Sequence, residues 1–254
     1  MSEKTKQVEV KKETLPVISI DFEADSANEF DNIGKEDTAI PFLKILQTNS
    51  PECDESNPEY IPGAKAGLFL NTVTKELIGN TVDVIPVADQ RIYNKWAERE
   101  KGGGYKGVVA IASEEVKAAK QDDRGRLVLD SGDYLVDTRN HFIIALYNDK
   151  ATPMLLPLTS TQVKKSRNWI GRMMDLKLKN KEGKKYTPPR YSHIYTLSTL
   201  TEKNDKGSWK GLKIDLKGVV EDIELYNEAK QFAALVKSEK VKVQEPVSES
   251  EENF

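Results

Sequence analysis

The chain has 254 residues, 31% of them charged and 38% hydrophobic, with a formal net charge of −3. This length fits one large or two small domains, and no segment approaches the roughly 18 uninterrupted apolar residues that a membrane-spanning helix needs. The amino-terminal residues lack the apolar region of a secretion signal, while one cysteine and two histidines exclude an internal disulfide and a Cys/His zinc cluster. These totals indicate a cytoplasmic protein with no membrane contact and no cofactor.

The nearly neutral sum hides an uneven distribution of charge. Residues 160–217 contain 15 Lys or Arg against 5 Asp or Glu, whereas residues 1–60 contain 6 basic and 14 acidic residues. A basic body between acidic ends suggests a polyanionic partner. The competing interpretation is a lysine-rich surface that only contacts solvent.

The amino-terminal half predicts an acidic arm followed by strands. Residues 1–38 are polar and acidic, so we expect a largely flexible arm. The apolar residues of 40–46 favour a short helix or a buried segment. Residues 63–96 alternate and are rich in Val, Ile and Thr, which predicts strands joined by tight turns.

The middle of the chain predicts a loop, a short helix and about three strands. Gly102–Gly104 are three consecutive glycines and indicate a flexible loop tip. Residues 112–121 favour a short helix. Residues 126–160 predict the strands, with a hairpin turn around Asn148 and Asp149.

Residues 159–179 give the clearest helix, which Thr159 or Ser160 can cap. On a helical wheel the side expected to face the core contains Val163, Ile170, Met173 and Met174. A different side contains Lys165, Trp169 and Arg172.

The remaining segments predict a basic loop, two strands and a final helix. Residues 180–190 are rich in lysine and contain two prolines, and residues 191–220 favour two strands around a turn. Residues 221–240 predict an amphipathic helix, and its expected core contacts are Ile223, Tyr226, Phe232 and Leu235. Beyond 242 the composition becomes polar and acidic, which favours disorder.

Together these elements predict a mainly β fold. Strands and helices do not alternate as they do in βαβ units, so we expect an OB-fold-like Greek-key barrel with additional hairpins, two or three helices and flexible termini. The domain boundaries follow: an arm at 1–38, one barrel domain at 39–240 and a disordered acidic tail at 241–254.

A catalytic alternative depends on carboxylates around residue 133. Asp130, Asp133 and Asp137 lie near His141, and Asp133 with Asp137 could hold a divalent metal in a metal-dependent nuclease. The same residues also suit an ordinary hairpin turn. No phosphate-binding glycine motif and no GxSxG elbow occur, so we expect no enzyme activity and no catalytic residue.

Aromatic residues interleaved with cations favour binding of single-stranded nucleic acid, because bases stack on exposed rings while Lys and Arg meet the phosphates. The residues expected to contact DNA are Arg91, Tyr93, Lys95, Trp96, Tyr105, Lys164, Lys165, Arg167, Trp169, Arg172, Lys185, Tyr186, Arg190, Trp209 and Lys210. The alternative is that each tryptophan packs in the interior. His141, Phe142, His193 and Tyr195 are expected to be structural strand residues.

The sequence closes on a phenylalanine that follows several glutamates. The ring is typical of an anchor for an apolar pocket on a partner, and the carboxylates of a charge that steers the encounter. Through Glu249, Glu251, Glu252 and Phe254, this tail resembles that of the single-stranded DNA-binding proteins of tailed bacteriophages. A second resemblance, to a group of phage proteins, rests on four segments: Pro41–Gln47, Val136–Phe142, Leu158–Trp169 and Tyr191–Gly211.

These resemblances imply an OB-fold protein that binds single-stranded DNA in phage replication, recombination or repair within the host cytoplasm. The tail would recruit phage or host replication proteins such as a polymerase, a helicase or a primase, and a homodimer is possible. Besides the nuclease, a virion or host-interaction protein whose basic face binds another protein stays open.

Overall fold

The structure is a computed structural model that describes residues 40–98, 102–122, 126–205 and 207–238. All of these residues belong to the compact unit Lys35–Phe254. The predicted arm and the predicted acidic tail, including Glu249, Glu251, Glu252 and Phe254, lie outside the described residues.

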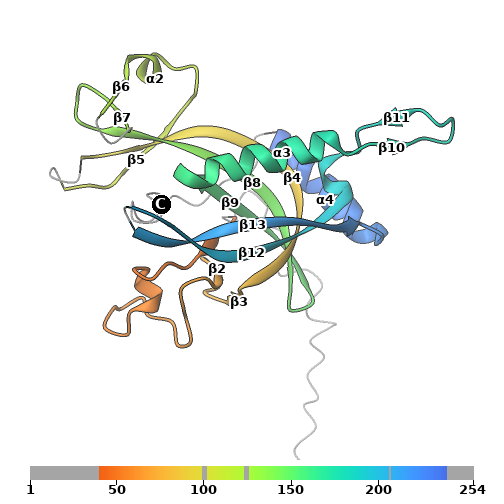
Figure 1. Ribbon diagram of the computed structural model, residues 1–254, viewed down its shortest axis with the longest axis horizontal. Helices are drawn as coiled ribbons and strands as arrows, with labels where there is room; N and C mark the ends of the chain where they lie inside the picture. Colours follow the sequence, from red (N-terminus) through yellow and green to blue (C-terminus); the bar gives the residue numbers. More distant parts are fainter. Residues whose placement is uncertain (1–39, 99–101, 123–125, 206, 239–254) are drawn as a thin grey trace, which may run out of the picture. The chain divides into compact units, whose positions relative to one another are not determined.

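One antiparallel sheet organises the described part of the chain (Figure 1). Its central order is β13-β12-β4-β8-β9, formed by β4 (Thr81–Trp96), β8 (Tyr134–Tyr147), β9 (Lys150–Thr159), β12 (His193–Asn204) and β13 (Gly207–Val219). A separate three-stranded sheet contains β1 (Leu43–Ile45), β2 (Phe69–Asn71) and β3 (Leu77–Gly79). The predicted residues 40–46 therefore form a buried strand segment rather than a helix.

The large sheet curls into a half-barrel, which confirms the prediction of a mainly β, OB-like fold. Strand β4 contributes to this curl because its register with β8 shifts between Pro86 and Ala88, where Val87 forms an irregularity. An extra residue of this kind bends a strand and increases its twist. The turn after β8 is the predicted hairpin, and Asn148 and Asp149 have φ angles of 49° and 58°, as a tight primed turn requires.

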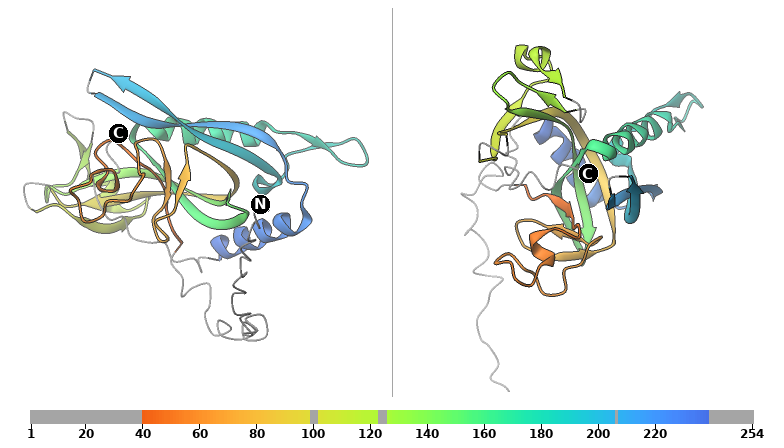
Figure 2. Two further views of the ribbon diagram at one scale, coloured as in Figure 1. Left: turned by 90° about the horizontal axis from the view of Figure 1, so that it is seen from below. Right: turned by 60° about the vertical axis from the view of Figure 1, so that its left-hand side comes forward.

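Side chains alternate between the two faces of the sheet, and each face is covered by one helix. Ile143 and Leu156 face helix α3 (Val163–Asp175), whereas Ile144 and Leu155 face helix α4 (Ile223–Lys237). Figure 2 shows the two helices on opposite sides of the curled sheet. With α2 (Glu114–Ala118), they supply the predicted two or three helices.

Helix α3 buries Val163 and Met173 as predicted, but its buried stripe also includes Trp169, which was expected on another side. Its buried residues are Val163, Ser166, Trp169 and Met173, whereas Met174 is 63% exposed. The prediction that Trp169 lies away from the core is therefore wrong. The cause is Ser166, whose hydroxyl lies 2.8 Å from Nε2 of buried His141 and so allows a polar residue to occupy the buried stripe.

Helix α4 begins at Ile223, after Asp222 caps it by accepting hydrogen bonds from the backbone N–H groups of Glu224 and Leu225. Its core contact Phe232 is confirmed, at 5% exposed. Ile223 was expected in the core but is 67% exposed, because it stands in the first turn before the helix reaches the sheet.

Side chains cover the outer edge of β13. The amide of Gln47 accepts a hydrogen bond from N–H of Lys210 and donates one to its carbonyl. Gln162 accepts from N–H of Leu212, and Arg172 donates to the carbonyl of Ile214. Helix α3 thus borders the sheet where a further strand would otherwise pair.

At the far ends of β4 and β8 a small lobe extends the sheet. It contains β5 (Tyr105–Val109), α2, β6 (Lys120–Gln121) and β7 (Leu127–Val128), around Tyr93, Val109 and Leu135. At the other end, beyond α3, residues 177–187 form a hairpin of β10 (Leu178–Lys179) and β11 (Lys185–Tyr186). From here on, "the arm" means this hairpin and not the predicted amino-terminal arm. Figures 1 and 2 show this arm projecting from the end of α3.

Candidate nucleic-acid interface

The predicted DNA contacts on β4 lie beside the lobe, and carboxylates already occupy their cations. Arg91 donates two hydrogen bonds to the carboxylate of Asp137, at 3.0 and 2.9 Å. The ammonium of Lys95 pairs with Glu115 and lies 3.7 Å from Asp133. Hydrogen bonds with these carboxylates raise the pKa of Arg91 and the pKa of Lys95. A neighbouring carboxylate therefore largely offsets the positive charge of each of these two side chains.

The aromatic rings of this region pack against each other rather than facing solvent. Trp96 is 1% exposed and Tyr93 is 7% exposed. The ring of Tyr105 meets Trp96 edge-on, with centroids 5.4 Å apart. The prediction that Trp96 offers a face for base stacking is therefore wrong, because strands β4 and β5 enclose it.

Trp169 is the second tryptophan that the structure removes from the predicted surface. It is 0% exposed, stacks on His141 with centroids 4.8 Å apart and meets Tyr195 edge-on. The prediction of DNA stacking on Trp169 is wrong because its ring fills the space between α3 and the sheet. Burial, with a smaller effect of Arg139, lowers the pKa of His141 to about 4, so this imidazole is neutral at pH 7.

The outer surface of α3 keeps part of the predicted set available. Lys164, Arg167 and Arg172 are exposed. Lys164 and Arg167 are three residues apart and therefore lie on one side of the helix. Lys165 differs, because it pairs with Glu202 of β12.

The third tryptophan lies at the free end of the β12–β13 hairpin, next to the start of α3. Trp209 is partly exposed, and its indole N–H donates to Glu202 at 3.0 Å. Burial by itself raises the pKa of Glu202, but hydrogen bonds from Lys165, Gln162 and Trp209 lower it overall. Glu202 therefore contacts two predicted DNA-binding residues, Lys165 and Trp209. A third, Lys210, follows Trp209 in β13.

The arm adds lysines that the prediction largely missed. Lys179, Lys181, Lys184 and Lys185 are exposed, as is Tyr186, at 45%. The amide oxygen of Asn180 accepts hydrogen bonds from two N–H groups of the turn, which shapes the hairpin. The signal in the sequence was the run NKEGKKY, in which three of seven positions are lysine.

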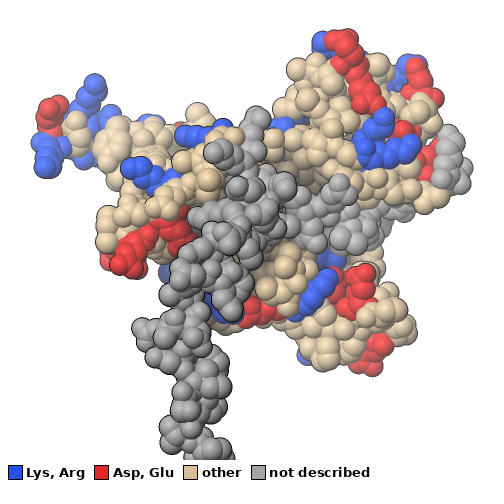
Figure 3. Space-filling model, turned by 180° about the vertical axis from the view of Figure 1, so that it is seen from behind, with Lys and Arg blue, Asp and Glu red and all other residues tan. Residues whose placement is uncertain are grey.

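We define the basic surface as the exposed cations of α3 and the arm that pair with no carboxylate among the described residues. Its members are Lys164, Arg167, Arg172, Lys177, Lys179, Lys181, Lys184 and Lys185. Between residues 164 and 185 the only acidic residues are Asp175 and Glu182. Figure 3 shows mostly Lys and Arg side chains with some acidic atoms at the end of the arm, and basic and acidic side chains next to each other on the lobe.

Arg190, another predicted phosphate contact, lies apart from this set. It pairs with Asp89 of β4 and lines a pocket of about 890 Å³. Burial lowers the pKa of Arg190. The structure therefore divides the predicted site into a lobe group, a group around Glu202, the basic surface and this pocket.

The carboxylates proposed for a nuclease are engaged with cations. Asp133 accepts a hydrogen bond from Lys106 at 2.7 Å, and Asp137 pairs with Arg91 and Arg139. Within residues 40–98, 102–122, 126–205 and 207–238, no group of three or more His, Cys, Asp and Glu side chains could hold a metal ion. The geometry therefore gives no support to metal-dependent cleavage.

In the part of the chain that the structure describes, no helix is long and apolar enough to cross a bilayer. Comparison with known protein families matches residues 10–242 to the family described as Pam3 phage gp34-like protein. Comparisons with curated proteins and with solved structures give no match.

Proposed function

Since the chain belongs to the Pam3 phage gp34-like protein family, we propose that it serves phage DNA replication, recombination or repair by binding single-stranded DNA. The observation that carries this proposal is the basic surface, whose exposed cations have no carboxylate partner among the described residues. Unpaired cations attract a polyphosphate chain because counterions leave the DNA when they bind. The interaction needs no particular base sequence and no catalytic group.

Aromatic rings at both ends of the basic surface would supply stacking. Tyr186 is exposed within the arm between lysines on the same hairpin, and Trp209 is partly exposed beside Lys210. A ring that is accessible on one face accepts any base, since every base has a π-face. The proposed path therefore runs from the β12–β13 hairpin along α3 to the arm, without the lobe.

Binding of a fluorescently labelled oligo(dT) to the full-length protein tests this proposal, with anisotropy measured at about 50 and about 200 mM salt. We expect affinity to fall with salt with a logarithmic slope near 0.7 per phosphate contacted. The variant Lys184→Ala/Lys185→Ala should weaken binding and flatten that slope. Absence of binding at the lower salt would reject the proposal and favour a protein partner for the basic surface.

The acidic tail would act separately from the DNA contacts. Glu249, Glu251, Glu252 and Phe254 combine an apolar ring with negative charge, which suits a basic-rimmed apolar pocket on a replication protein. The proposed role is recruitment of a phage or host polymerase, helicase or primase to the coated strand. Phe254→Ala should then abolish partner binding and leave the affinity for oligo(dT) unchanged, as measured by co-sedimentation and anisotropy.

A further inference from the structure

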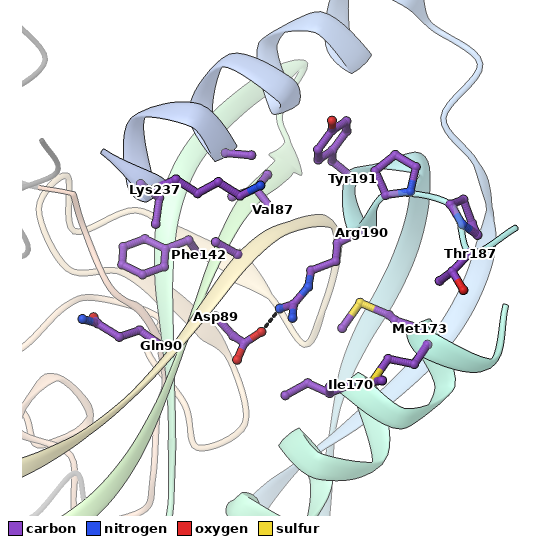
Figure 4. A pocket seen from close by; sticks show the side chains of 16 residues that line it. Val87, Asp89, Gln90, Phe142, Ile170, Met173, Thr187, Arg190, Tyr191 and Lys237 are labelled. Atoms are coloured by element: carbon purple, nitrogen blue, oxygen red, sulfur yellow. Dashed lines mark ion pairs between the residues drawn. The ribbon is translucent and has the colours of Figure 1, made fainter. Parts of the chain in front are cut away.

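The pocket that contains Arg190 has the size and lining of a ligand site. It measures about 890 Å³ and is enclosed by β4, the carboxyl-terminal halves of α3 and α4, and the segment 187–191 (Figure 4). Apolar side chains form its walls: Val87, Phe142, Ile170, Met173 and Val236. Sites for small molecules commonly have volumes of this order, with apolar walls and a few polar groups.

A single ion pair stands in the middle of these apolar walls. Figure 4 shows the guanidinium of Arg190 and the carboxylate of Asp89 meeting between the segment 187–191 and β4, with Gln90 and Lys237 farther out. The two side chains stay 39% and 26% exposed, so a ligand can reach them. The pocket therefore offers N–H donors of Arg190 beside the second carboxylate oxygen of Asp89, whose Oδ1 is buried against the guanidinium.

This pairing of opposite charges selects the ligand. A phosphate or carboxylate group would be attracted by Arg190 but repelled by Asp89 beside it. A purely apolar side chain would cover the ion pair without offering it any hydrogen bond, which is unfavourable. A flat neutral ring with donors and acceptors on one edge satisfies both charges and fills the apolar walls.

A nucleobase is such a ring. The Watson–Crick edge of each of the four bases carries at least one N–H donor beside at least one acceptor, so Asp89 can accept from the base while Arg190 donates to it. Proteins that take a base out of its stack hold it in this way, with hydrogen bonds to its edge and apolar or aromatic side chains against its faces. The chemistry fits any base and so agrees with sequence-independent binding.

The pocket is also continuous with the basic surface. Ile170, Met173 and Met174 in its wall belong to α3, whose outer side carries Arg167. The segment 187–191 follows directly on Lys185 and Tyr186 of the arm. A strand bound along α3 and the base of the arm therefore passes the opening of the pocket.

We propose that this pocket receives one unstacked base of the bound single strand, held by Asp89 and Arg190 between the walls formed by Phe142 and Met173. This inference rests on the proposed function, because it assumes that the strand follows the basic surface.

The test uses the full-length protein and an oligonucleotide that contains 2-aminopurine, a fluorescent base whose emission is quenched by stacking on its neighbours. Its amino group can donate to Asp89 and its ring nitrogens can accept from Arg190. We expect emission to rise severalfold on binding, because the probe leaves the stack for the pocket. In Asp89→Asn/Arg190→Gln, which removes both charges together, the rise should be lost and affinity reduced about tenfold.

Two further variants keep the result decisive. Arg190→Lys preserves the charge opposite Asp89 but not the planar fork of donors, and should lose most of the rise even if the double variant fails to fold. With the variant Lys184→Ala/Lys185→Ala on the arm, saturating the oligonucleotide should take more protein. The emission at saturation should equal that of the wild type.

Each remaining outcome overturns a stated claim. Binding with an equal rise in the wild type and in both pocket variants would place the base elsewhere, while single-stranded DNA binding stands. Loss of the rise when a peptide of residues 243–254 is added, with affinity unchanged, would assign the pocket to the tail. No binding of any oligonucleotide at low salt would reject the proposed function together with this inference.

Discussion

The lobe and the arm both contain many charged residues, yet only the arm presents a net positive surface. In the lobe, and on the strands that support it, each of five cations has a carboxylate partner: Lys95–Glu115, Lys106–Asp133, Lys117–Glu114, Lys120–Asp130 and Arg126–Asp122. The lysines of the arm have no such partner among the described residues. Exposed pairs of this kind contribute little to stability, but they cancel the field that a polyanion would feel. The number of lysines in a segment therefore says less about DNA binding than the number of carboxylates near them.

The aromatic residues of the two regions differ in the same way. Trp96 and Tyr105 pack on each other beside the lobe, whereas Tyr186 is exposed on the arm. A ring in the lobe should therefore matter for folding and a ring in the arm for binding. The predictions below separate these two effects, beginning with the largest.

Trp96→Ala should destabilise the protein by about 3–5 kcal/mol, because a large buried side chain is removed and a cavity remains. Urea unfolding followed by circular dichroism would measure this loss. Oligo(dT) affinity, measured where the variant is still folded, should stay close to that of the wild type. A stable variant with weakened binding would mean that Trp96 contacts DNA. The aromatic residues of the lobe and of the arm would then not differ in their role.

Tyr186→Ala should weaken oligo(dT) binding by about 1–3 kcal/mol, the usual contribution of one stacking ring. Because the side chain is 45% exposed and lies in a two-stranded hairpin, the free energy of unfolding should change by less than about 0.5 kcal/mol. Tyr186→Phe is the matched control and should bind as the wild type does. Equal affinity of the alanine variant and the wild type would mean that the arm contributes only its charge to DNA binding.

Charge reversal tests the cations of the two regions directly. Lys181→Glu/Lys184→Glu on the arm should lower affinity for oligo(dT) about tenfold or more and reduce the salt slope by about 0.7 per lysine. Lys117→Glu/Lys120→Glu on the lobe is matched in number and charge and should change affinity far less. Similar losses from both pairs, measured by anisotropy, would mean that only the net charge of the protein matters.

The smallest effect concerns pH and is confined to the lobe. A hydrogen bond from Lys106 lowers the pKa of Asp133 below its ordinary value of 3.8. The folded state thus binds this proton less readily than the unfolded state, so the stabilisation is complete above the ordinary carboxyl pKa and is lost as pH falls through the lowered one.

Melting temperatures between about pH 6 and about pH 3 would measure the contribution of Asp133. Asp133→Asn should lose stability at the neutral end and fall less steeply toward acid than the wild type. Lys184→Ala/Lys185→Ala should follow the wild-type profile, because no carboxylate pairs with these lysines among the described residues. An identical acid slope for the wild type and Asp133→Asn would remove the Asp133 ion pair as a source of stability.

Local signals made much of the fold predictable. Alternating residues predicted β4, and Asn148 with Asp149 predicted the hairpin turn, because such signals depend only on neighbouring positions. The curled sheet followed from the absence of βαβ spacing.

The buried stripe of α3 was predicted only in part because it depends on a distant partner. Ser166 is buried only because it meets His141, which is 25 positions away. The helical wheel therefore placed Val163 and Met173 correctly but assigned Trp169 to the surface. A correct assignment needed the pairing of α3 with β8, which no local pattern contains.

The candidate site suffered from the same limit. Arg91 and Asp137 are 46 positions apart in the sequence and bond across two strands, so composition did not reveal that this cation is occupied. The arm, in contrast, is continuous in sequence and contains few acidic residues. Its basic character was therefore visible in the sequence, although the individual lysines were mostly not chosen.

The covered edge of β13 has a consequence for how the protein is made. Gln47, Gln162 and Arg172 come from three separate segments, and all must arrive before the N–H and C=O groups of the last strand are satisfied. A nascent chain that has formed β12 and β13 but has not yet seated α3 exposes a bare strand, which other copies can extend into aggregates. Substitution of Gln162 by a residue without an amide should therefore lower the soluble yield on expression more than it lowers the stability of the purified protein.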